Sequence, residues 1–311
     1  SANWRSEAGA PPPKRVVIAD DTTTGDTAYR LACEGTAMLW RGDFQNARQL
    51  LQALARRADK PKKAAKASKV PKAKPTPTEA FHLHRQAQSQ RARTLSMLLL
   101  PFDADHLVPL RRSPDVREAC LEAYGEVDAP YVASMRELLG LIGAHEWRKK
   151  GVEIPALAER IHPYYGVFSP VRGEYIDLVA QAPLPSTELA FDIGTGTGVL
   201  AAVLARRGVR RVVATELAPR ALACAQDNLR RLGLQGQVEL LAADLFPPGR
   251  APLVVCNPPW LPARPSSTIE QSVYDEGSRM LKGLLAGLGE HLSPGGEGWL
   301  VLSDLAEHLG L

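Results

Sequence analysis

The tetrapeptide Asn257-Pro258-Pro259-Trp260 has the residue types needed to hold and activate an amino group. An amino group on an amide or a nucleobase is a poor nucleophile, because its lone pair is delocalised. The side-chain oxygen of Asn257 and the carbonyl of Pro258 can each accept one of its N–H bonds, which draws the nitrogen towards a pyramidal geometry. The prolines stiffen the segment, and the Trp260 ring offers a flat surface to the conjugated group. This pattern predicts attack by a planar amino group through positioning rather than a strong base. The alternative is an ordinary proline-rich turn after a strand.

A glycine-rich loop lies upstream of this motif. The apolar run Leu189-Ala190-Phe191-Asp192-Ile193 reads as a buried strand and opens into Gly194-Thr195-Gly196-Thr197-Gly198. Glycines at a strand-to-helix turn let the backbone approach a ligand closely, and the helix N-terminus that follows offers free N–H groups to an anionic group. A dinucleotide-binding loop is similar. Here the spacing is Gly-x-Gly-x-Gly, and an acid, Asp192, precedes it.

Acidic residues end three consecutive predicted strands. Asp192 lies in the first, Glu216 ends Val212-Val213-Ala214-Thr215-Glu216, and Asp244 follows the third in Ala242-Ala243-Asp244-Leu245-Phe246. Glu216 is placed to accept both hydroxyls of a ribose. Any one of these acids alone is more often a capping or solvated residue. Three of them at one edge of a parallel sheet predict a cofactor site, which includes Leu245 beside Asp244.

An Asp-x-Gly-x-Gly-x-Gly loop followed by Asn-Pro-Pro-aromatic resembles the class I S-adenosylmethionine-dependent methyltransferases. Within them it is similar to the branch that methylates glutamine side chains and adenine. The resemblance covers the chain from about Gly166 to its end and implies S-adenosyl-L-methionine as cofactor. It also implies that the Gly194–Gly198 loop and Asp192 contact the methionine part, that Asp244 contacts the adenine, and that Asn257 to Trp260 hold the acceptor.

The resemblance leaves the acceptor open. A helical region ahead of the motifs and the segment Ser169-Pro170-Val171-Arg172-Gly173-Glu174 resemble protein-glutamine methyltransferases that modify translation factors. Two features depart from that pattern, because those enzymes usually carry Tyr at the Trp260 position and have a shorter N-terminal part. The alternative is an adenine or guanine amino group of ribosomal or transfer RNA, since Trp260 suits stacking on a flipped base. An alternative of another class is a non-catalytic scaffold that retains the fold, which the intact acids and Asn257 disfavour.

Composition favours a cytoplasmic protein that needs no metal. The chain has 311 residues, 45% of them hydrophobic and 23% charged, and no apolar run approaches the ~20 residues of a membrane span. Its four cysteines form no Cys-x-x-Cys pair, which argues against a zinc site or a disulfide framework and fits a reducing compartment. The sequence does not predict the oligomeric state.

The pattern of hydrophobic residues predicts two domains. Residues 1–151 are expected to be mostly helical, with a helical hairpin over 26–57, helices over 79–100, 113–125 and 131–147, and irregular structure before residue 21. Residues 60–78 are rich in Lys, Pro and Ala; they hold seven lysines, without which the formal net charge of +4 becomes −3. This segment reads as a solvated linker, or alternatively as a cationic arm for RNA. In residues 152–311 strands and helices alternate, which predicts a Rossmann-like parallel sheet.

The end of the chain raises a further expectation. The fold that the second domain resembles has seven strands, of which five can be placed here. Trp299-Leu300-Val301-Leu302 would then form an apolar edge strand, which natural proteins avoid exposing. We therefore expect either that C-terminal strands are missing or that another element covers this edge.

Overall fold

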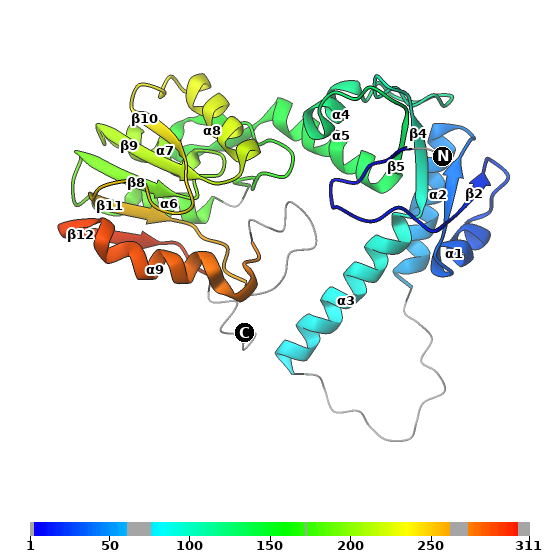
Figure 1. The fold of residues 1–311 in the computed structure, drawn as a ribbon, viewed down its shortest axis with the longest axis horizontal. Helices are drawn as coiled ribbons and strands as arrows, with labels where there is room; N and C mark the ends of the chain where they lie inside the picture. Colours follow the sequence, from blue (N-terminus) through cyan, green and yellow to red (C-terminus); the bar gives the residue numbers. More distant parts are fainter. Residues whose placement is uncertain (1–2, 61–75, 172, 262–272, 304–311) are drawn as a thin grey trace. The chain divides into compact units, whose positions relative to one another are not determined.

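The protein divides into two compact units, each built on a five-stranded sheet (Figure 1). The computed structural model describes residues 3–60, 76–171, 173–261 and 273–303. The units meet in sequence at Gly143 and Ala144, inside helix α5 (Met135–Lys150). The predicted domain boundary between residues 151 and 152 falls just after this helix. Within the described ranges, the structure contains no helix with the length and apolar character needed to cross a membrane.

In the first unit the sheet has the strand order β1-β5-β4-β3-β2. Strands β2, β3 and β4 run parallel, β5 runs antiparallel to β4, and β1 pairs parallel with β5. The strands are β1 (Asn3–Trp4), β2 (Arg15–Ala19), β3 (Thr36–Trp40), β4 (Leu98–Phe102) and β5 (Tyr131–Ser134). The helices are α1 (Gly25–Cys33), α2 (Phe44–Ala58), α3 (Pro77–Leu95), α4 (Arg117–Tyr124) and the first part of α5.

The sheet of the first unit corrects several expectations from the sequence. The predicted hairpin over 26–57 is wrong, because β3 separates α1 from α2. The predicted helix over 79–100 runs into strand β4, and the predicted helix over 131–147 begins with strand β5. Strand β2 lies in the part expected to be irregular. Helices still hold more residues than strands, but they are arranged around a sheet. The physical reason is burial: all residues of β4 and nearly all of β3 are buried, so these strands lack the alternation that marks a half-exposed strand.

In the second unit the sheet is parallel throughout, with the order β10-β9-β8-β11-β12. The strands are β8 (Leu189–Ile193), β9 (Arg211–Glu216), β10 (Val238–Ala242), β11 (Ala251–Cys256) and β12 (Leu292–Leu300). The helices are α6 (Glu174–Gln181), α7 (Val199–Arg206), α8 (Pro219–Arg231) and α9 (Arg279–His291), with the short 3-10 turns η1 (Pro155–Leu157) and η3 (Glu276–Ser278). A small hairpin of β6 (Val152–Ile154) and β7 (Glu159–Ile161) precedes them. The predicted Rossmann-like sheet is confirmed, and β12 begins earlier than the edge strand predicted over Trp299 to Leu302.

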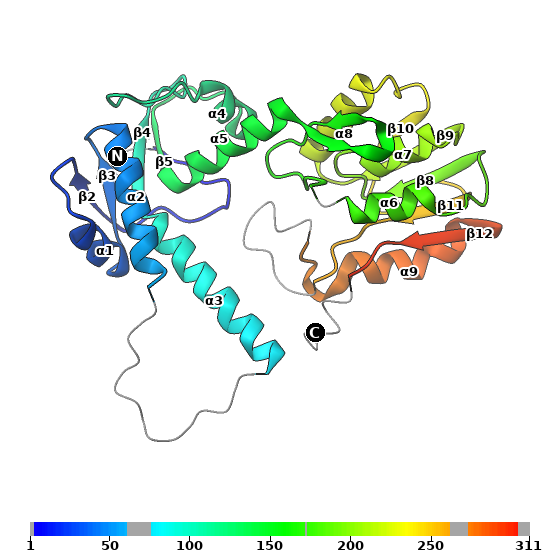
Figure 2. The same ribbon diagram turned by 180° about the vertical axis from the view of Figure 1, so that it is seen from behind.

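Alternating side chains of these strands build two cores, one on each face of the sheet. Ala190, Val212 and Val255 face the core that contains the apolar sides of α6, α7 and α8. Phe191 and Val254, one residue along their strands, face the other core, which α9 covers through Leu284. The ribbon seen from both sides shows this arrangement, with α9 on one face and α6 to α8 on the other (Figures 1 and 2). Helices on both faces leave the ends of the strands free to carry a site.

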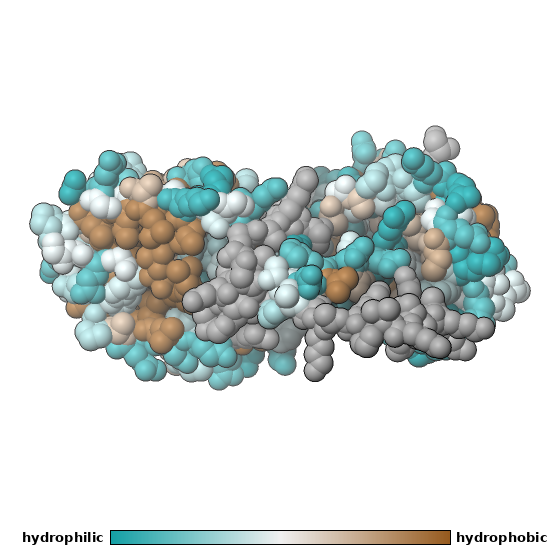
Figure 3. Space-filling view, turned by 90° about the horizontal axis from the view of Figure 1, so that it is seen from below, coloured by the Kyte–Doolittle hydropathy of each residue, from teal (hydrophilic) through white to brown (hydrophobic). Residues whose placement is uncertain are grey.

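Strand β12 forms one edge of the described sheet, beside β11. The half-buried Trp299 packs on the first core and Leu300 on the second. Near this edge, the outer side of α9 exposes Leu285 to 57%. Figure 3 shows an apolar area on the same face of this unit. Apolar surface of this kind commonly marks a contact surface.

Candidate functional site

A cavity of about 750 Å³ opens at the carboxyl ends of the parallel strands of the second unit. It brings together most of the site residues predicted from the sequence: Asp192, Gly194, Thr195, Gly196, Thr197, Glu216, Asp244, Leu245, Asn257 and Pro259. Gly198, Pro258 and Trp260 do not line it. The strand register explains the gathering. Ile193 is level with both Thr215 and Cys256, so the residues that follow these three meet at one edge.

The glycine loop depends on backbone conformations that favour glycine. Gly194, Gly196 and Gly198 have φ angles of +69°, +56° and +81°. The Thr195 N–H donates to the Thr215 carbonyl at 2.9 Å, which ties the loop to β9. Gly198 begins α7, where an added Cβ would lie 3.3 Å from Cβ of Ala225. Gly198 therefore serves the packing of α7 against α8, while its predicted contact with a cofactor remains a prediction.

Replacing the loop glycines should separate backbone strain from steric contact. Gly196→Ala should lower the free energy of unfolding by about 1–2 kcal/mol, the cost of a left-handed conformation for a residue with a Cβ, since nothing lies within 4 Å of that Cβ. Gly194→Ala should cost slightly more, because its Cβ would lie 2.8 Å from the Met280 methyl group, which ends a flexible side chain and must shift. Urea denaturation in a double-mutant cycle with Met280→Ala measures the excess. An equal cost for Gly194→Ala with and without Met280 would contradict this account.

Asp192 is the buried charge of the site, with 1% of its surface exposed. Its Oδ2 atom accepts bonds from the Thr195 hydroxyl at 2.6 Å and from the Ala201 N–H, in the first turn of α7, at 3.0 Å. Both bonds use Oδ2, so Oδ1 is left for a ligand in the cavity. Burial raises the pKa of Asp192 to about 6, against the lowering effect of these two bonds. A carboxylate held this way is suited to a cationic ligand group.

Glu216 links the glycine loop to the start of α8. Its Oε2 accepts from the Gly196 N–H at 3.1 Å, and its Oε1 accepts from the N–H groups of Leu217 and Ala218 at 2.8 and 2.9 Å. Each carboxylate oxygen has two lone pairs, so Oε1 is fully used and Oε2 retains capacity for a hydroxyl donor. The backbone bonds fix the carboxylate at the cavity wall, where the sequence analysis expects it to meet a ribose.

Asp244 and Leu245 form the wall that follows β10. Asp244 is paired with Arg279, the first residue of α9, at 3.1 Å, and both side chains are more than half exposed. Leu245 has a φ of +73°, and its carbonyl accepts the Thr215 hydroxyl at 2.5 Å. A non-glycine residue in this conformation is strained and persists where its surroundings fix it, often at functional sites.

The Asn257 motif lies beside the glycine loop because β11 and β8 are neighbours in register. Asn257 follows Cys256, which is level with Ile193, so Asn257 is adjacent to Gly194 along the sheet edge. Beyond Pro258, which is buried, the N–H groups of Trp260 and Leu261 both donate to the Val273 carbonyl. This pairing joins residues 260 and 261 to residue 273, and residues 262–272 lie outside the described part. The stacking role expected for Trp260 therefore stays a prediction.

Several cavity residues have no counterpart in the sequence-based site. They come from the segment before α6 and the first turn of α6, from the start of α8, and from the start of α9 and the residues before it: Gly166, Val167, Phe168, Tyr175, Arg220, Tyr274, Asp275, Arg279 and Met280. Asp275 fixes the residues at the start of α9. Its N–H donates to the Leu261 carbonyl at 2.9 Å, and its side chain accepts from the Met280 N–H at 2.7 Å. Among the described residues, no group of three or more His, Cys, Asp or Glu side chains could hold a metal ion.

Comparison with known families identifies the second unit. Residues 166–308 match the family of methyltransferase small domains. This part of the chain is a class I methyltransferase domain. S-adenosylmethionine is the cofactor of this family, and the cavity with Asp192, Glu216 and the glycine loop lies in this part of the chain.

Three curated proteins show which enzymes the methyltransferase domain is similar to. The release factor glutamine methyltransferase of Cereibacter sphaeroides is 35% identical over 41% of this chain and 43% of its own length. That of Moorella thermoacetica is 39% identical over 35% of this chain and 41% of its own length. The ribosomal RNA small subunit methyltransferase C of Alcanivorax borkumensis is 34% identical over 44% of this chain and 41% of its own length. The chain thus spans less than half the length of each of these relatives.

Proposed function

We propose that this protein transfers the methyl group of S-adenosylmethionine to a planar exocyclic amino group of a macromolecule. The observation that carries the proposal is the placement of Asn257 next to Gly194 at the sheet edge, in a cavity that also holds a buried carboxylate. One pocket thereby combines a set of residues suited to the cofactor with an amide suited to the acceptor. The match to methyltransferase small domains supports the same reading.

The residues of the cavity fit S-adenosylmethionine. Its volume of about 750 Å³ lies within the range of roughly 300–1,000 Å³ that is usual for small-molecule sites. Asp192 and the glycine loop would hold the methionine part, Glu216 the ribose hydroxyls, and Asp244 with Leu245 the adenine. The cofactor would supply an electrophilic methyl group on a sulfonium centre.

The role of Asn257 follows from hydrogen bonding. Its side-chain oxygen and the Pro258 carbonyl would accept the two N–H bonds of the acceptor amino group and turn the nitrogen lone pair towards the methyl group. The stiffness of the two prolines keeps these acceptors in place before the acceptor arrives. Most of the rate enhancement would come from this alignment.

Binding of the cofactor should depend on pH through Asp192. Burial raises the pKa of this carboxyl group to about 6 in the free protein. The α-ammonium group of the ligand favours the ionised form. Below pH 6 the carboxyl group is protonated, so affinity for S-adenosylhomocysteine should fall, by up to about tenfold for each further pH unit. Calorimetric titrations from pH 5 to pH 8 measure this. Asp192→Asn should flatten the profile, and an unchanged slope in that variant would assign the titration to another group.

We infer a glutamine side-chain amide of a translation-related protein as the acceptor. The support is the similarity to two release factor glutamine methyltransferases, together with the geometry expected for an amide held by Asn257. A second candidate is the amino group of adenine or guanine in ribosomal or transfer RNA. It is supported by the Alcanivorax relative and by the seven lysines between Lys60 and Lys74, which lie mostly outside the described residues.

A labelling experiment distinguishes these acceptors. Full-length protein is incubated with methyl-tritiated S-adenosylmethionine and a lysate of cells that lack the gene, and the labelled macromolecules are digested. Release of the label by protease alone supports the glutamine amide, and release by nuclease alone supports the RNA base. Absence of label in a preparation that binds S-adenosylhomocysteine would favour the non-catalytic scaffold.

A further inference from the structure

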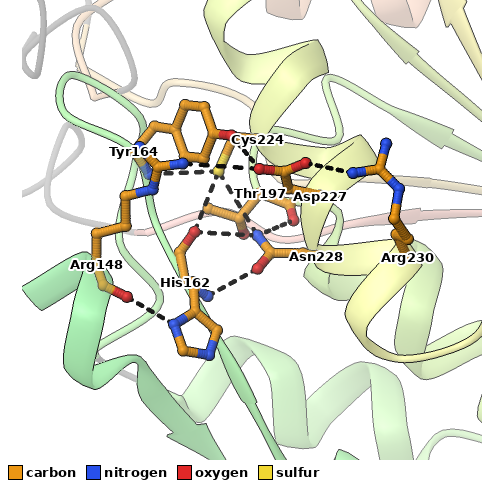
Figure 4. Close-up of polar contacts among 8 residues, drawn as sticks. All are labelled: Arg148, His162, Tyr164, Thr197, Cys224, Asp227, Asn228 and Arg230. Carbon is orange, nitrogen blue, oxygen red and sulfur yellow. Dashed lines mark hydrogen bonds and ion pairs between the residues drawn. The ribbon is translucent and has the colours of Figure 1, made fainter. Parts of the chain in front are cut away.

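Asn228 is a buried polar residue of α8 that lies outside the cavity. It contacts the glycine loop and a second segment that leads to the cavity. Only 1% of its surface is exposed, and its side chain points between the backbone of His162 and that of Thr197 (Figure 4). A buried amide is tolerated only where its donors and acceptor find partners. The identity of these partners suggests a function.

The amide of Asn228 is fully used by the backbone of two separate segments. Its Oδ1 accepts the His162 N–H at 2.8 Å, and its Nδ2 donates to the Thr197 carbonyl at 3.0 Å and to the His162 carbonyl at 3.3 Å. Only an Asn or Gln side chain offers one acceptor and two donors in a neutral group, so the pattern is specific to the residue type.

Each segment leads into the cavity. Thr197 belongs to the glycine loop and itself lines the cavity. His162 begins the stretch that continues into Gly166, Val167 and Phe168, which form another part of the cavity wall. One side chain therefore fixes the glycine loop relative to the wall that carries Phe168.

Other residues of α8 also bind the segment that begins at His162. The Tyr164 N–H donates to Sγ of Cys224 at 3.3 Å, and its hydroxyl donates to Asp227. The Arg148 guanidinium lies 3.8 Å from the centre of the Tyr164 ring, and Arg230 pairs with Asp227 at 2.9 Å. These contacts, drawn in Figure 4, anchor Tyr164 to α8, while Asn228 is the member of the group that reaches the glycine loop.

We propose that Asn228 is a positioning residue for the cofactor, which sets the glycine loop and the Gly166–Phe168 wall at the separation that S-adenosylmethionine requires. This inference rests on the proposed function of the cavity. Asn228 does not touch the cavity, so it acts through the Thr197 carbonyl and the His162 backbone. Its loss should move the loop before any ligand binds.

Two variants of Asn228 and one neighbour test the inference in the full chain. Asn228→Asp keeps the acceptor for the His162 N–H and replaces both donors with an oxygen facing two carbonyls. Asn228→Ser is milder, because it is neutral but too short to span both segments. Leu229→Ala is the matched control, since Leu229 is equally buried on the same helix and faces only the apolar core. Affinity for S-adenosylhomocysteine is measured by calorimetry, alongside melting temperature and the ¹⁵N amide resonances of Gly194, Gly196 and Gly198.

Asn228→Asp should weaken S-adenosylhomocysteine binding at least tenfold and shift the three glycine resonances in the free protein. Leu229→Ala should lower the melting temperature but keep the affinity within threefold and leave these resonances in place. If the Asp variant does not fold, the Ser variant decides, with a weakening of at least fivefold expected. Binding within threefold of the parent in a folded Asn228 variant overturns the inference, as does an equal loss in Leu229→Ala. A parent protein that does not bind S-adenosylhomocysteine would instead overturn the proposed function.

Discussion

Asn257→Ala should reduce methyl transfer by about 10²–10³-fold, the usual cost of removing one pre-placed hydrogen-bonding group at a reacting centre. Asn257 stands beside Gly194 at the end of β11, where its amide oxygen can hold an acceptor nitrogen. In the proposed site, other residues hold the cofactor. Affinity for S-adenosylhomocysteine should therefore change less than threefold. Transfer of tritium to the macromolecular fraction and calorimetric binding are measured on the same preparation.

The separation of the two effects is the informative part of this prediction. A tenfold or greater loss of S-adenosylhomocysteine affinity in Asn257→Ala would place Asn257 on the cofactor side of the cavity. Full transfer activity in the variant would remove it from the reaction altogether. Pro259→Ala should cost less transfer activity than Asn257→Ala, because Pro259 lines the cavity but offers no side-chain acceptor, and its loss removes only part of the stiffness of the segment.

Asp192→Asn should have the opposite profile and weaken cofactor binding by about 10–100-fold at pH 7.5, the range expected for a lost charge-assisted hydrogen bond. The substitution keeps the shape of the side chain, and an amide oxygen can still accept the bonds now made by Thr195 and Ala201. The protein should therefore stay folded while the charge that attracts the α-ammonium group of the ligand is gone. Calorimetric titration with S-adenosylhomocysteine measures the effect.

Glu188→Gln is the matched control for this variant. Glu188 immediately precedes β8, so it lies at the opposite end of the strand from the cavity, and it forms an exposed pair with Arg210. Removing its charge should leave binding unchanged. Equal losses of affinity in Asp192→Asn and Glu188→Gln would mean that any negative charge on this unit attracts the ligand. The specific role proposed for Asp192 would then be wrong.

The sheet of the methyltransferase domain could be predicted because each of its strands ends in a recognisable way. Strands β8 and β9 lie within one residue of the predicted runs at either end. Parallel strands share one carboxyl edge, so Asp192, Glu216 and Asn257 could be assigned to a single site without coordinates. The structure brings these residues to one cavity.

Strands of the first unit were missed for a reason that is general. All side chains of β4, Leu98 to Phe102, are buried, and β3 differs only in that Leu39 is half-buried. Such runs look the same whether they form a strand or extend a helix, and only the neighbouring strands decide between them. Local pattern alone could not supply that information.

Residues that complete the site from distant segments were missed for a different reason. Met280 and Arg279 reach the cavity because Asp275 fixes the start of α9, and that contact depends on the path of the chain after Leu261. Asn228 lies in helix α8, and its residue type alone does not indicate a function. Its role becomes visible only when the carbonyl of Thr197 and the backbone of His162 are seen on either side of it.

One calorimetric experiment tests the central claim most directly. S-adenosylhomocysteine and NAD are titrated separately into the full-length protein at pH 7.5, because a glycine-rich loop after a strand serves both kinds of cofactor. One S-adenosylhomocysteine is expected to bind per chain, and NAD is expected not to bind. Failure to bind S-adenosylhomocysteine, or binding of NAD with equal affinity, would contradict the assignment of the cavity.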